Sequence, residues 1–554
     1  MKKRLIGVLV LVTLLISTMA STSVASFAAG NSVSITLPNF KVIINGQAVN
    51  NDYSKYPLIV YKDITYFPMT FSDCRFLGLE STWTGDKTGL LVDATGVTAA
   101  YNPYLSSAKN IKNYTAEIAN FPIKVNGKAV DNSKEEYPLL LFRDITYFPM
   151  TWKYSVGEFG WDYKFDGKNG LVITSKNAKL DQIQIPTNRL AEQYGDFEGK
   201  NSIAVMAKNG YAYYVDNKGA VMQAPLSDIS KAKKIFQLEI WSYGDGKQYD
   251  RHEFYEENGK AMLFFHSGGA VMGSDHRYLL KEDGTVQKIQ SSYYETTLIR
   301  DRLYMYWIGP TPGPGNLRVQ DIDYSEDSNR SLGSADYWYY FLSDVEGLPK
   351  LELIGNELYV RAAKVAQNQE GDGSYSLENP AVYRVNIFTN EVTRISQSKE
   401  RVVNAQIVGE SLYYLCSKGE GEQRIYSVYK HSLQDGTEAL IGNFEGEDSW
   451  QLKFAVVGDH VYYLSREALY RIGDSESLNP QAEAISMNIT GDEKEYLACT
   501  FRETPNSKYR VMIFDESGEV VFKTADCGSN VVVEGSTLHF YNITTETLCK
   551  TTIK

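Results

Sequence analysis

One stretch of the chain occurs twice near the N-terminus, and it constrains the fold more than any other feature. YPLIVYKDITYFPMT covers residues 56–70, and YPLLLFRDITYFPMT covers residues 137–151. Eleven of the 15 positions are identical, and the other four exchange residues of the same type. We therefore expect two copies of one structural module in this part of the chain.

Each copy predicts the same order of elements. An Asn-Gly pair ends the first strand in a tight hairpin turn, and apolar strands follow. A proline then stops the last of these strands and suits the first turn of a short helix, which a glycine ends. These residues are Asn45-Gly46, Pro68 and Gly78 in the first copy and Asn126-Gly127, Pro149 and Gly160 in the second. The sequence thus predicts two small α+β modules, residues 33–95 and 116–176, each with an antiparallel sheet and one short helix.

The module resembles the stalk-type domain found at the N-terminus of some copper amine oxidases and in many secreted bacterial proteins. The matching features are the Asn-Gly turn, the Thr-Tyr-Phe-Pro-Met junction, the helix-ending glycine and a later tryptophan, within residues 37–93 and 118–173. Modules of that family usually carry an arginine pair beside the junction, where this chain has Ile64 and Thr70, and Ile145 and Thr151.

The resemblance does not extend to copper chemistry. The oxidase core needs a tyrosine in an Asn-Tyr-acid context and three histidines around the copper. The nearest match is Asn113-Tyr114-Thr115, and none of the six histidines lies in a His-x-His pair. We therefore predict no copper amine oxidase activity.

The first residues are typical of an export signal. Met1 to Arg4 is cationic, Leu5 to Ile16 is apolar, and Ser26-Phe27-Ala28 fits the small-x-small cleavage rule. The alternative is an uncleaved membrane anchor, but the apolar core is too short to span a bilayer comfortably. We expect residues 1–28 to be a signal peptide cut after Ala28, or after the neighbouring Ala29. The mature chain is then secreted from a bacterium, either free or attached to the cell wall, with no transmembrane segment.

From about residue 200 a short tyrosine-rich motif recurs, in which a turn residue precedes alternating aromatic residues. Its copies start at residues 210, 259, 300, 355, 409, 458, 492 and 535, so the spacing is that of one four-stranded propeller blade. We predict a β-propeller over residues 201–554, with eight blades or, if one copy is false, seven. Residues 177–200 are expected to be a linker, in which Asp181–Ile185 could close the last blade. The tyrosine-rich pattern resembles the propellers related to the low-density-lipoprotein-receptor type. The alternative to a propeller is an array of β-sandwiches.

Charge and cysteine content narrow the class of protein. The net charge of −12 argues against a nucleic-acid-binding protein, because phosphate binding needs clustered Lys and Arg. The five cysteines are scattered, without a Cys-x-x-Cys motif, which argues against a disulfide framework and structural zinc. Buried free thiols are expected, and a Cys527–Cys549 bridge is the alternative.

Candidate catalytic and metal-binding motifs are incomplete. Asp321 to Asp327 resembles the start of a calcium loop, but its sixth position is Glu326 and its twelfth is Leu332, where glycine and glutamate are needed. His252 beside Glu253 and His276 beside Asp275 could do acid–base work, but no nucleophile elbow or His-Glu-x-x-His accompanies them. We therefore predict no catalytic residue, no metal site and no cofactor.

Aromatic residues give the candidate ligand contacts. Trp307 begins a loop rich in Pro and Gly, and Tyr337, Trp338 and Tyr339 belong to an aromatic run. Aromatic rings suit sugar rings and peptide prolines. The alternative is that the run is strand core and the loop a rigid surface segment.

Three hypotheses of function follow. The first is a secreted or cell-envelope-associated, non-catalytic binding or scaffold protein, whose propeller recognises an envelope glycan or protein. The second is an extracellular polysaccharide hydrolase or lyase, with carboxylates at the mouth of the propeller channel. The third is a structural component of the envelope or of a spore coat.

Overall fold

The protein is mainly β, as the sequence predicts. The computed structural model describes residues 32–553 apart from 177–179, 187–204, 217, 239, 244–245, 250–251, 258, 268–273, 293–295, 301–303, 309–312, 322–327, 344–349, 368–374, 420–423, 447–451, 480–481, 503–508 and 528–530. The predicted signal peptide and most of the linker at 177–200 lie outside the described residues. No helix among the described residues is long and apolar enough to cross a membrane.

By their contacts the described residues form two units. Unit 1 contains residues 32–74, Glu80–Ala94 and Pro103–Thr174. Unit 2 contains Arg75–Leu79, Thr95–Asn102 and the chain from Ser175 onward. The repeated stretches lie in unit 1 and the tyrosine-rich motif lies in unit 2.

The centre of unit 1 is a closed barrel built from both repeats. Its strands are, in spatial order, β1 (Ser32–Thr36), β4 (Ile59–Tyr61), β5 (Ile64–Pro68), β12 (Ile145–Pro149), β11 (Leu140–Phe142) and β8 (Asn113–Ile118). The duplicated strands β5 and β12 pair antiparallel, with Phe67 opposite Phe148. Tyr66 and Tyr147 are completely buried in the core with Ile59 and Leu140. The most strictly repeated residues therefore make the contact between the two repeats.

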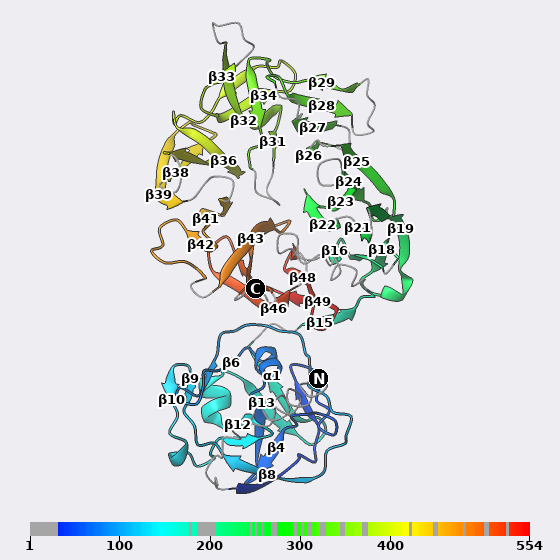
Figure 1. Ribbon diagram of the computed structural model, residues 1–554, viewed down its shortest axis with the longest axis vertical. Coiled ribbons are helices and arrows are strands. Elements are labelled where there is room, and N and C mark those ends of the chain that lie inside the picture. Colours follow the sequence, from blue (N-terminus) through cyan, green and yellow to red (C-terminus); the bar gives the residue numbers. More distant parts are fainter. Residues whose placement is uncertain are drawn as a thin grey trace, which may run out of the picture. The chain divides into compact units, whose positions relative to one another are not determined.

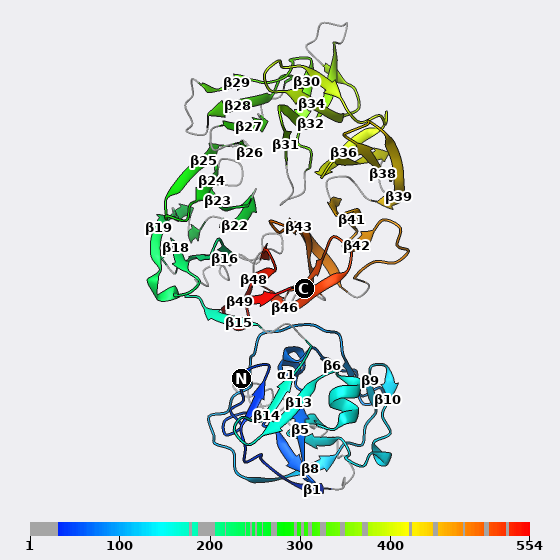
Figure 2. The ribbon, with the colours of Figure 1, turned by 180° about the vertical axis from the view of Figure 1, so that it is seen from behind.

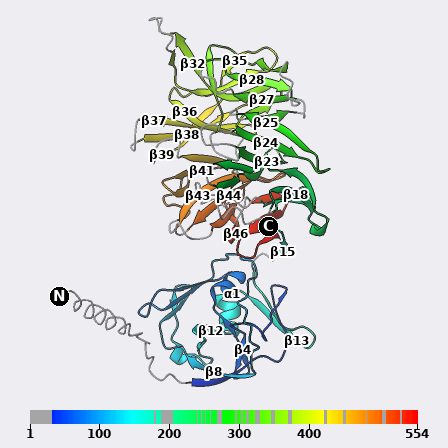
Figure 3. The ribbon, with the colours of Figure 1, turned by 45° about the vertical axis from the view of Figure 1, so that its right-hand side comes forward.

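The two repeats also exchange strands. One sheet has the order β10 (Lys128–Ala129), β9 (Ile123–Val125), β7 (Leu90–Asp93), β6 (Glu80–Trp83). The other has the order β13 (Asp162–Asp166), β14 (Gly170–Thr174), β2 (Val42–Ile44), β3 (Gln47–Ala48). The pairs β7–β9 and β14–β2 are parallel and join different repeats. Each module thus lacks the antiparallel sheet of its own that we expected, and Figure 3 shows strands of both repeats lying together.

Short helices follow the two prolines, as predicted. The first is α1 (Phe71–Phe76) and the second is the π-helix η2 (Trp152–Glu158). The Thr70 hydroxyl caps α1 by accepting the Asp73 N–H at 3.1 Å. Gly78 and Gly160 follow the ends of the two helices, with φ of 84° and 66°, a backbone region that favours glycine. A 3₁₀ turn, η1 (Asn132–Lys134), precedes the second duplicated stretch.

Unit 2 is a succession of antiparallel sheets, which we number along the chain. The first four are β16 (Val205–Lys208), β17 (Tyr211–Val215), β18 (Ala220–Pro225) and β19 (Lys233–Gln237); β22 (His252–Glu257), β23 (Lys260–Ser267), β24 (Ser274–Leu280) and β25 (Val286–Ser292); β26 (Thr296–Arg300), β27 (Tyr304–Ile308), β28 (Leu317–Asp321) and β29 (Arg330–Ser331); and β30 (Tyr337–Tyr340), β32 (Glu357–Gln367), β34 (Ala381–Asn386) and β35 (Val392–Arg394), with β31 (Glu352–Ile354) and β33 (Tyr375–Leu377) paired to β32. The turn η4 (Ile229–Lys231) precedes β19, and the hairpin β20 (Ile240–Tyr243), β21 (Gly246–Tyr249) follows it.

The remaining sheets continue this pattern. They are β36 (Arg401–Val408), β37 (Ser411–Lys418), β38 (Arg424–Ser432) and β39 (Glu438–Gly446); β40 (Lys453–Val457), β41 (His460–Ser465) and β42 (Ala468–Arg471); β43 (Glu483–Thr490), β44 (Tyr496–Arg502), β45 (Tyr509–Phe514) and β46 (Val520–Cys527); and β47 (Val532–Glu534), β48 (Thr537–Asn542), β49 (Thr547–Thr552) and β15 (Asp181–Gln184). A single residue pair, Cys527 with Asn542, connects the last two of them. The strand expected at Asp181–Ile185 is β15, and it pairs antiparallel with β49.

Hydrophobic clusters join successive sheets of unit 2. One cluster combines Leu358 of the fourth sheet with Val319 of the third, and another combines Val428 of the fifth with Val456 of the sixth. The first sheet packs on the last, because Tyr214 shares a cluster with Tyr541. Figure 1 shows the sheets following one another around a ring, and Figure 2 shows the same order from behind. The recurring motif marks hairpin turns between the inner strands, where Gly409 and Gly458 adopt positive φ.

All five cysteines are free and buried, which confirms the expected buried thiols and leaves Cys527 and Cys549 unbridged.

Candidate functional site

The structure places the predicted ligand-contact aromatics mainly in strands. Tyr339 is buried in the core of the third and fourth sheets, where its hydroxyl accepts the Ser334 N–H at 2.8 Å. Tyr337 and Trp338 are half-buried on β30, and the Tyr337 ring packs edge-on against Tyr383 with centroids 5.1 Å apart. The side chain of Trp307, on β27, lies outside the described residues. Tyr339 is therefore strand core and is not accessible to a ligand.

The other sequence candidates are not brought together either. Residues 322–327, the centre of the calcium-like segment, lie outside the described residues, as does the side chain of Asp275. His276 stacks its ring on Phe265 with centroids 4.5 Å apart, which is a packing contact. His252 is half-buried at the start of β22. Within the described part of the chain, no group of histidine, cysteine and acidic residues has the arrangement of a metal site.

The structure does bring together four charged residues that the sequence analysis did not predict. They are Lys208 at the end of β16, Glu256 on β22, Asp492 after β43 and Glu534 at the end of β47, and we call them the hub cluster. They come from the first, second, seventh and eighth sheets. In Figure 1, β16 and β22 lie on the inner side of the ring, and β19 and β25 lie on its outer side.

Lys208 is the centre of the hub cluster. Its Nζ lies 3.3 Å from Glu256 Oε2 and 3.5 Å from Glu534 Oε1, and its side chain is only 2% exposed. Glu534 Oε1 also accepts the N–H of Asn209 at 2.8 Å, and Asp492 Oδ1 accepts the N–H of Gly535 at 2.7 Å. Ion pairs and hydrogen bonds thus connect the beginning of the ring with its end.

The carboxyl groups of the hub cluster differ in their electrostatic environment. Burial raises the pKa of Glu256; the Lys208 ammonium opposes this rise, and the charges of Glu534 and Asp492 add to it. The hydrogen bond from the Gly535 N–H holds the pKa of Asp492 below its ordinary value. The cluster therefore combines a carboxyl group whose pKa is raised with one whose pKa is lowered. This arrangement can act as an ionic connection between sheets or, with substrate access, as an acid–base pair.

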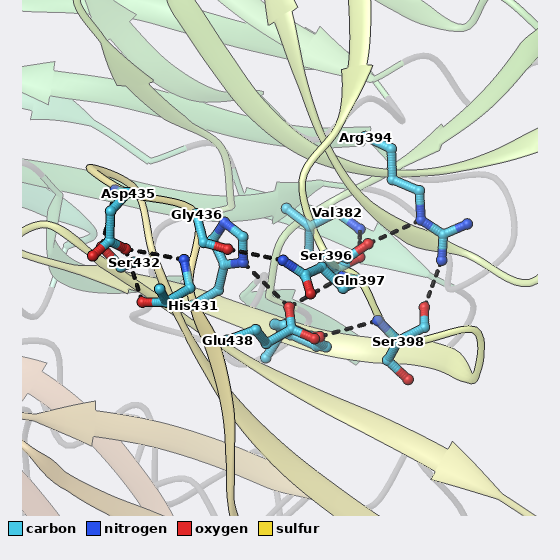
Figure 4. A network of polar contacts seen from close by, with 12 residues as sticks. Val382, Arg394, Ser396, Gln397, Ser398, His431, Ser432, Asp435, Gly436 and Glu438 are labelled. Carbon is cyan, nitrogen blue, oxygen red and sulfur yellow. Dashed lines mark hydrogen bonds and ion pairs between the residues drawn. The ribbon is translucent and has the colours of Figure 1, made fainter.

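A second polar network lies between the fourth and fifth sheets (Figure 4). His431 Nδ1 on β38 is 3.2 Å from Glu438 Oε2 on β39, and both side chains are 8% exposed. Glu438 Oε2 also accepts the N–H of Gln397 at 3.1 Å, while Ser396 Oγ accepts the N–H of Val382 at 3.0 Å. His431, Glu438 and Ser396 are buried and hydrogen-bonded, so the network fixes the segment between the two sheets and is not an open reactive site.

One signal in the sequence could have revealed the hub cluster. Val408 and Val457 occupy the inner-strand position directly before the glycine of the motif, as does Ile354. In the first and last copies this region carries Lys208 and Glu534, which are charged residues on otherwise apolar strands. A charge on a buried strand needs a partner, but the partners come from other sheets, and only the fold identifies them.

Comparison with known proteins gives no family. No family model matches the chain, and no curated protein matches it. Among solved structures, dipeptidyl peptidase 4 of Porphyromonas gingivalis is similar at 10% identity and a TM-score of 0.39, over 65% of this chain and 59% of that one. The matched region thus spans about three fifths of the peptidase. An oligogalacturonate lyase in complex with manganese is similar at 11% identity and a TM-score of 0.33, over 56% of this chain and 95% of the lyase.

Proposed function

We propose that the protein is a secreted or cell-envelope-associated, non-catalytic binding protein, and that unit 2 is an eight-bladed β-propeller that recognises an envelope glycan or protein. The signal peptide predicted from the sequence of residues 1–28 supports the location. The succession of eight sheets, with Tyr541 of the last packed against Tyr214 of the first, supports the propeller. Closing the ring covers the apolar faces of the first and last sheets, which an open array would leave exposed.

The state of Lys208 carries the non-catalytic part of the proposal. The Lys208 side chain is only 2% exposed. Its ammonium group forms ion pairs with two glutamates of neighbouring sheets, so it is not available to a substrate. A general acid or base must instead reach its substrate within hydrogen-bonding distance. The charges of the hub cluster thus stabilise the scaffold, and recognition falls to the surface around them.

Binding of the mature chain, residues 29–554, to envelope fractions tests this proposal. Tagged protein is incubated separately with purified peptidoglycan, with the soluble envelope glycans and with extracted surface proteins, and heat-unfolded protein is the control. We expect saturable binding to one fraction that the unfolded chain lacks. Absence of saturable binding to all three fractions would contradict the proposal.

The second candidate is an extracellular polysaccharide hydrolase or lyase, and the carboxyl groups of the hub cluster favour it. Glu256 and Glu534 both approach the Lys208 ammonium; burial raises the pKa of Glu256, and the hydrogen bond from the Gly535 N–H lowers that of Asp492. Two carboxyl groups with opposite pKa shifts are the usual arrangement of a glycosidase. Release of reducing ends or of unsaturated products from polysaccharides by the wild type, abolished in Glu256→Gln, would establish this candidate and overturn the first.

A further inference from the structure

Unit 1 presents two pairs of aromatic rings at equivalent positions of its repeats, and each pair has one exposed and one half-buried ring. Trp83, at the end of β6, packs edge-on against Phe121 with ring centroids 5.1 Å apart and an interplanar angle of 84°. Phe165, on β13, packs in the same way against Phe40, at 5.1 Å and 88°. Phe40 and Phe121 occupy equivalent positions, because each lies the same distance along the chain before its copy of the duplicated stretch. We call the two ring pairs the aromatic platforms.

Each aromatic platform is assembled from both repeats, because the strands are exchanged. Phe121 lies just before β9, which pairs with β7, and Phe40 lies just before β2, which pairs with β14. Equivalent hydrogen bonds fix the two sites: the N–H of Leu90 donates to the Pro122 carbonyl at 3.0 Å, and that of Leu171 donates to the Lys41 carbonyl at 2.9 Å. The two platforms therefore have matching geometry and rigid support on the sheets.

Packing alone does not explain these rings. An edge-on pair of rings adds little to stability when one ring is exposed, and a ring placed for stability is normally covered. Trp83 is 51% exposed and Phe165 is 62% exposed. The hairpins beside them have diverged, to Thr-Gly-Asp-Lys-Thr-Gly after Trp83 and Asp-Gly-Lys-Asn-Gly after Phe165, yet both begin with an exposed aromatic residue. The shared feature is thus a large ring facing water.

We propose that the aromatic platforms are two equivalent binding sites for neutral pyranose sugars. The apolar face of a pyranose ring packs against an exposed aromatic face, and polar groups at the rim bind its hydroxyls. Each neighbouring hairpin supplies such groups, Thr84 and Thr88 in one and Asn169 in the other, and carries one aspartate and one lysine, so that its charge cancels. Two equal sites suit a polymer whose own units repeat. This inference places sugar recognition in unit 1 and is independent of the ligand proposed for unit 2.

Binding of the mature chain to cellulose and chitin, and to soluble cellohexaose and chitohexaose, tests the inference. We expect two equivalent hexaose sites by calorimetry for at least one of the two sugars. Trp83→Ala and Phe165→Ala should each leave one site, and each should weaken retention on the polymer on the order of tenfold, while the double variant loses binding. Trp152→Ala and Phe388→Ala remove aromatic residues that are 72% and 70% exposed outside the platforms, and they should bind like the wild type.

A gain-of-signal variant guards against loss of folding. Phe165→Trp keeps a ring at the second platform, and its fluorescence should change on addition of the hexaose in a Trp83→Phe background. The inference is overturned by a wild type that binds none of the four sugars, by a double variant that binds like the wild type, by control variants that lose binding equally, or by one site instead of two. Envelope binding that persists in the double variant leaves the proposal for unit 2 standing when this one fails.

Discussion

Gln406 and Val456 exchange two hydrogen bonds between the fifth and sixth sheets. Gln406 Nε2 donates to the Val456 carbonyl at 2.8 Å, and the Val456 N–H donates to Gln406 Oε1 at 2.8 Å. Both residues are buried. Asn316 forms the same pair of bonds with Tyr339, at 3.0 and 2.8 Å, between the third and fourth sheets. Amide side chains thus fasten consecutive sheets where apolar packing alone would leave backbone groups unpaired.

Gln406→Leu should destabilise unit 2 by about 2–4 kcal/mol, because it leaves a buried N–H and a buried carbonyl without partners. Chemical denaturation followed by tyrosine fluorescence measures the loss, and faster hydrogen exchange at Val456 locates it. Gln397→Leu is the matched control, since the exposed Gln397 amide makes one bond, to Gly436 O at 2.8 Å. Equal stability of the two variants would show that the Gln406 pair does not hold the sheets.

Much of this architecture could be predicted from local patterns. The duplicated stretch places β5 and β12, the prolines place α1 and η2, and the glycines of the motif place the hairpins of unit 2, because turn chemistry acts over a few residues. The pairing partner of a strand could not be predicted in this way. β2 could pair with β7 of its own repeat or with β14 of the other, and the two repeats offer it nearly the same residues. The sequence therefore gives no reason to choose, and the exchange depends on the connection between the repeats.

The candidate sites needed the fold for a related reason. Lys208 belongs to the first sheet of unit 2 and Glu534 to the last, and they meet only because the last sheet returns to the first. The rings of Trp83 and Phe121 meet only because the strands are exchanged. Tyr339 was a candidate ligand contact because its segment is rich in aromatic residues. The alternation of side chains on a buried strand places its ring in the core instead.

Lys208→Met should destabilise unit 2 by about 3–5 kcal/mol at pH 7, because it leaves Glu256 and Glu534 partly buried without their cation. The loss should shrink as the pH falls towards 4, because protonation of Glu256, whose pKa is raised by burial, removes one unpaired charge. Denaturant midpoints at a series of pH values measure this. Lys418→Met is the control, since Lys418 is 76% exposed and lies 3.7 Å from Glu400. A Lys208 variant as stable as this control would refute the structural role of the hub cluster.

Gly89→Ala should disrupt the strand exchange in unit 1. A Cβ on Gly89, whose φ is +75°, would lie 1.7 Å from the Pro122 carbonyl oxygen, in the neighbouring exchanged segment. Gly127 has nearly the same φ, +76°, but open space around its Cβ position. Gly127→Ala therefore reports backbone strain alone, about 1–2 kcal/mol, and Gly89→Ala should cost several kcal/mol more. Thermal unfolding of unit 1 compares them, and equal losses would mean that the β7–β9 contact is not tight.

His539 should make unit 2 sensitive to mild acid. It is 3% exposed, and neither ring nitrogen has a hydrogen-bond partner among the described residues. Burial, and to a smaller extent the Lys550 charge, lower its pKa from 6.5 to about 4. Between these values the unfolded chain binds the proton and the folded chain does not, so stability falls as the pH drops from 6.5 to about 4.

The contribution of His539 to this loss is up to about 3 kcal/mol. His539→Phe should remove it and also replace two unpaired nitrogens by carbon, so that the variant is at least as stable as the wild type at pH 5. In Lys550→Met the pKa of His539 should be higher, because a nearby cation is removed. The stability of this variant should therefore fall less than that of the wild type as the pH drops, and the fall should level off at a higher pH. Unfolding free energies of the three proteins from pH 7 to pH 4 provide the comparison. Parallel curves for the wild type and His539→Phe would mean that other groups cause the acid sensitivity.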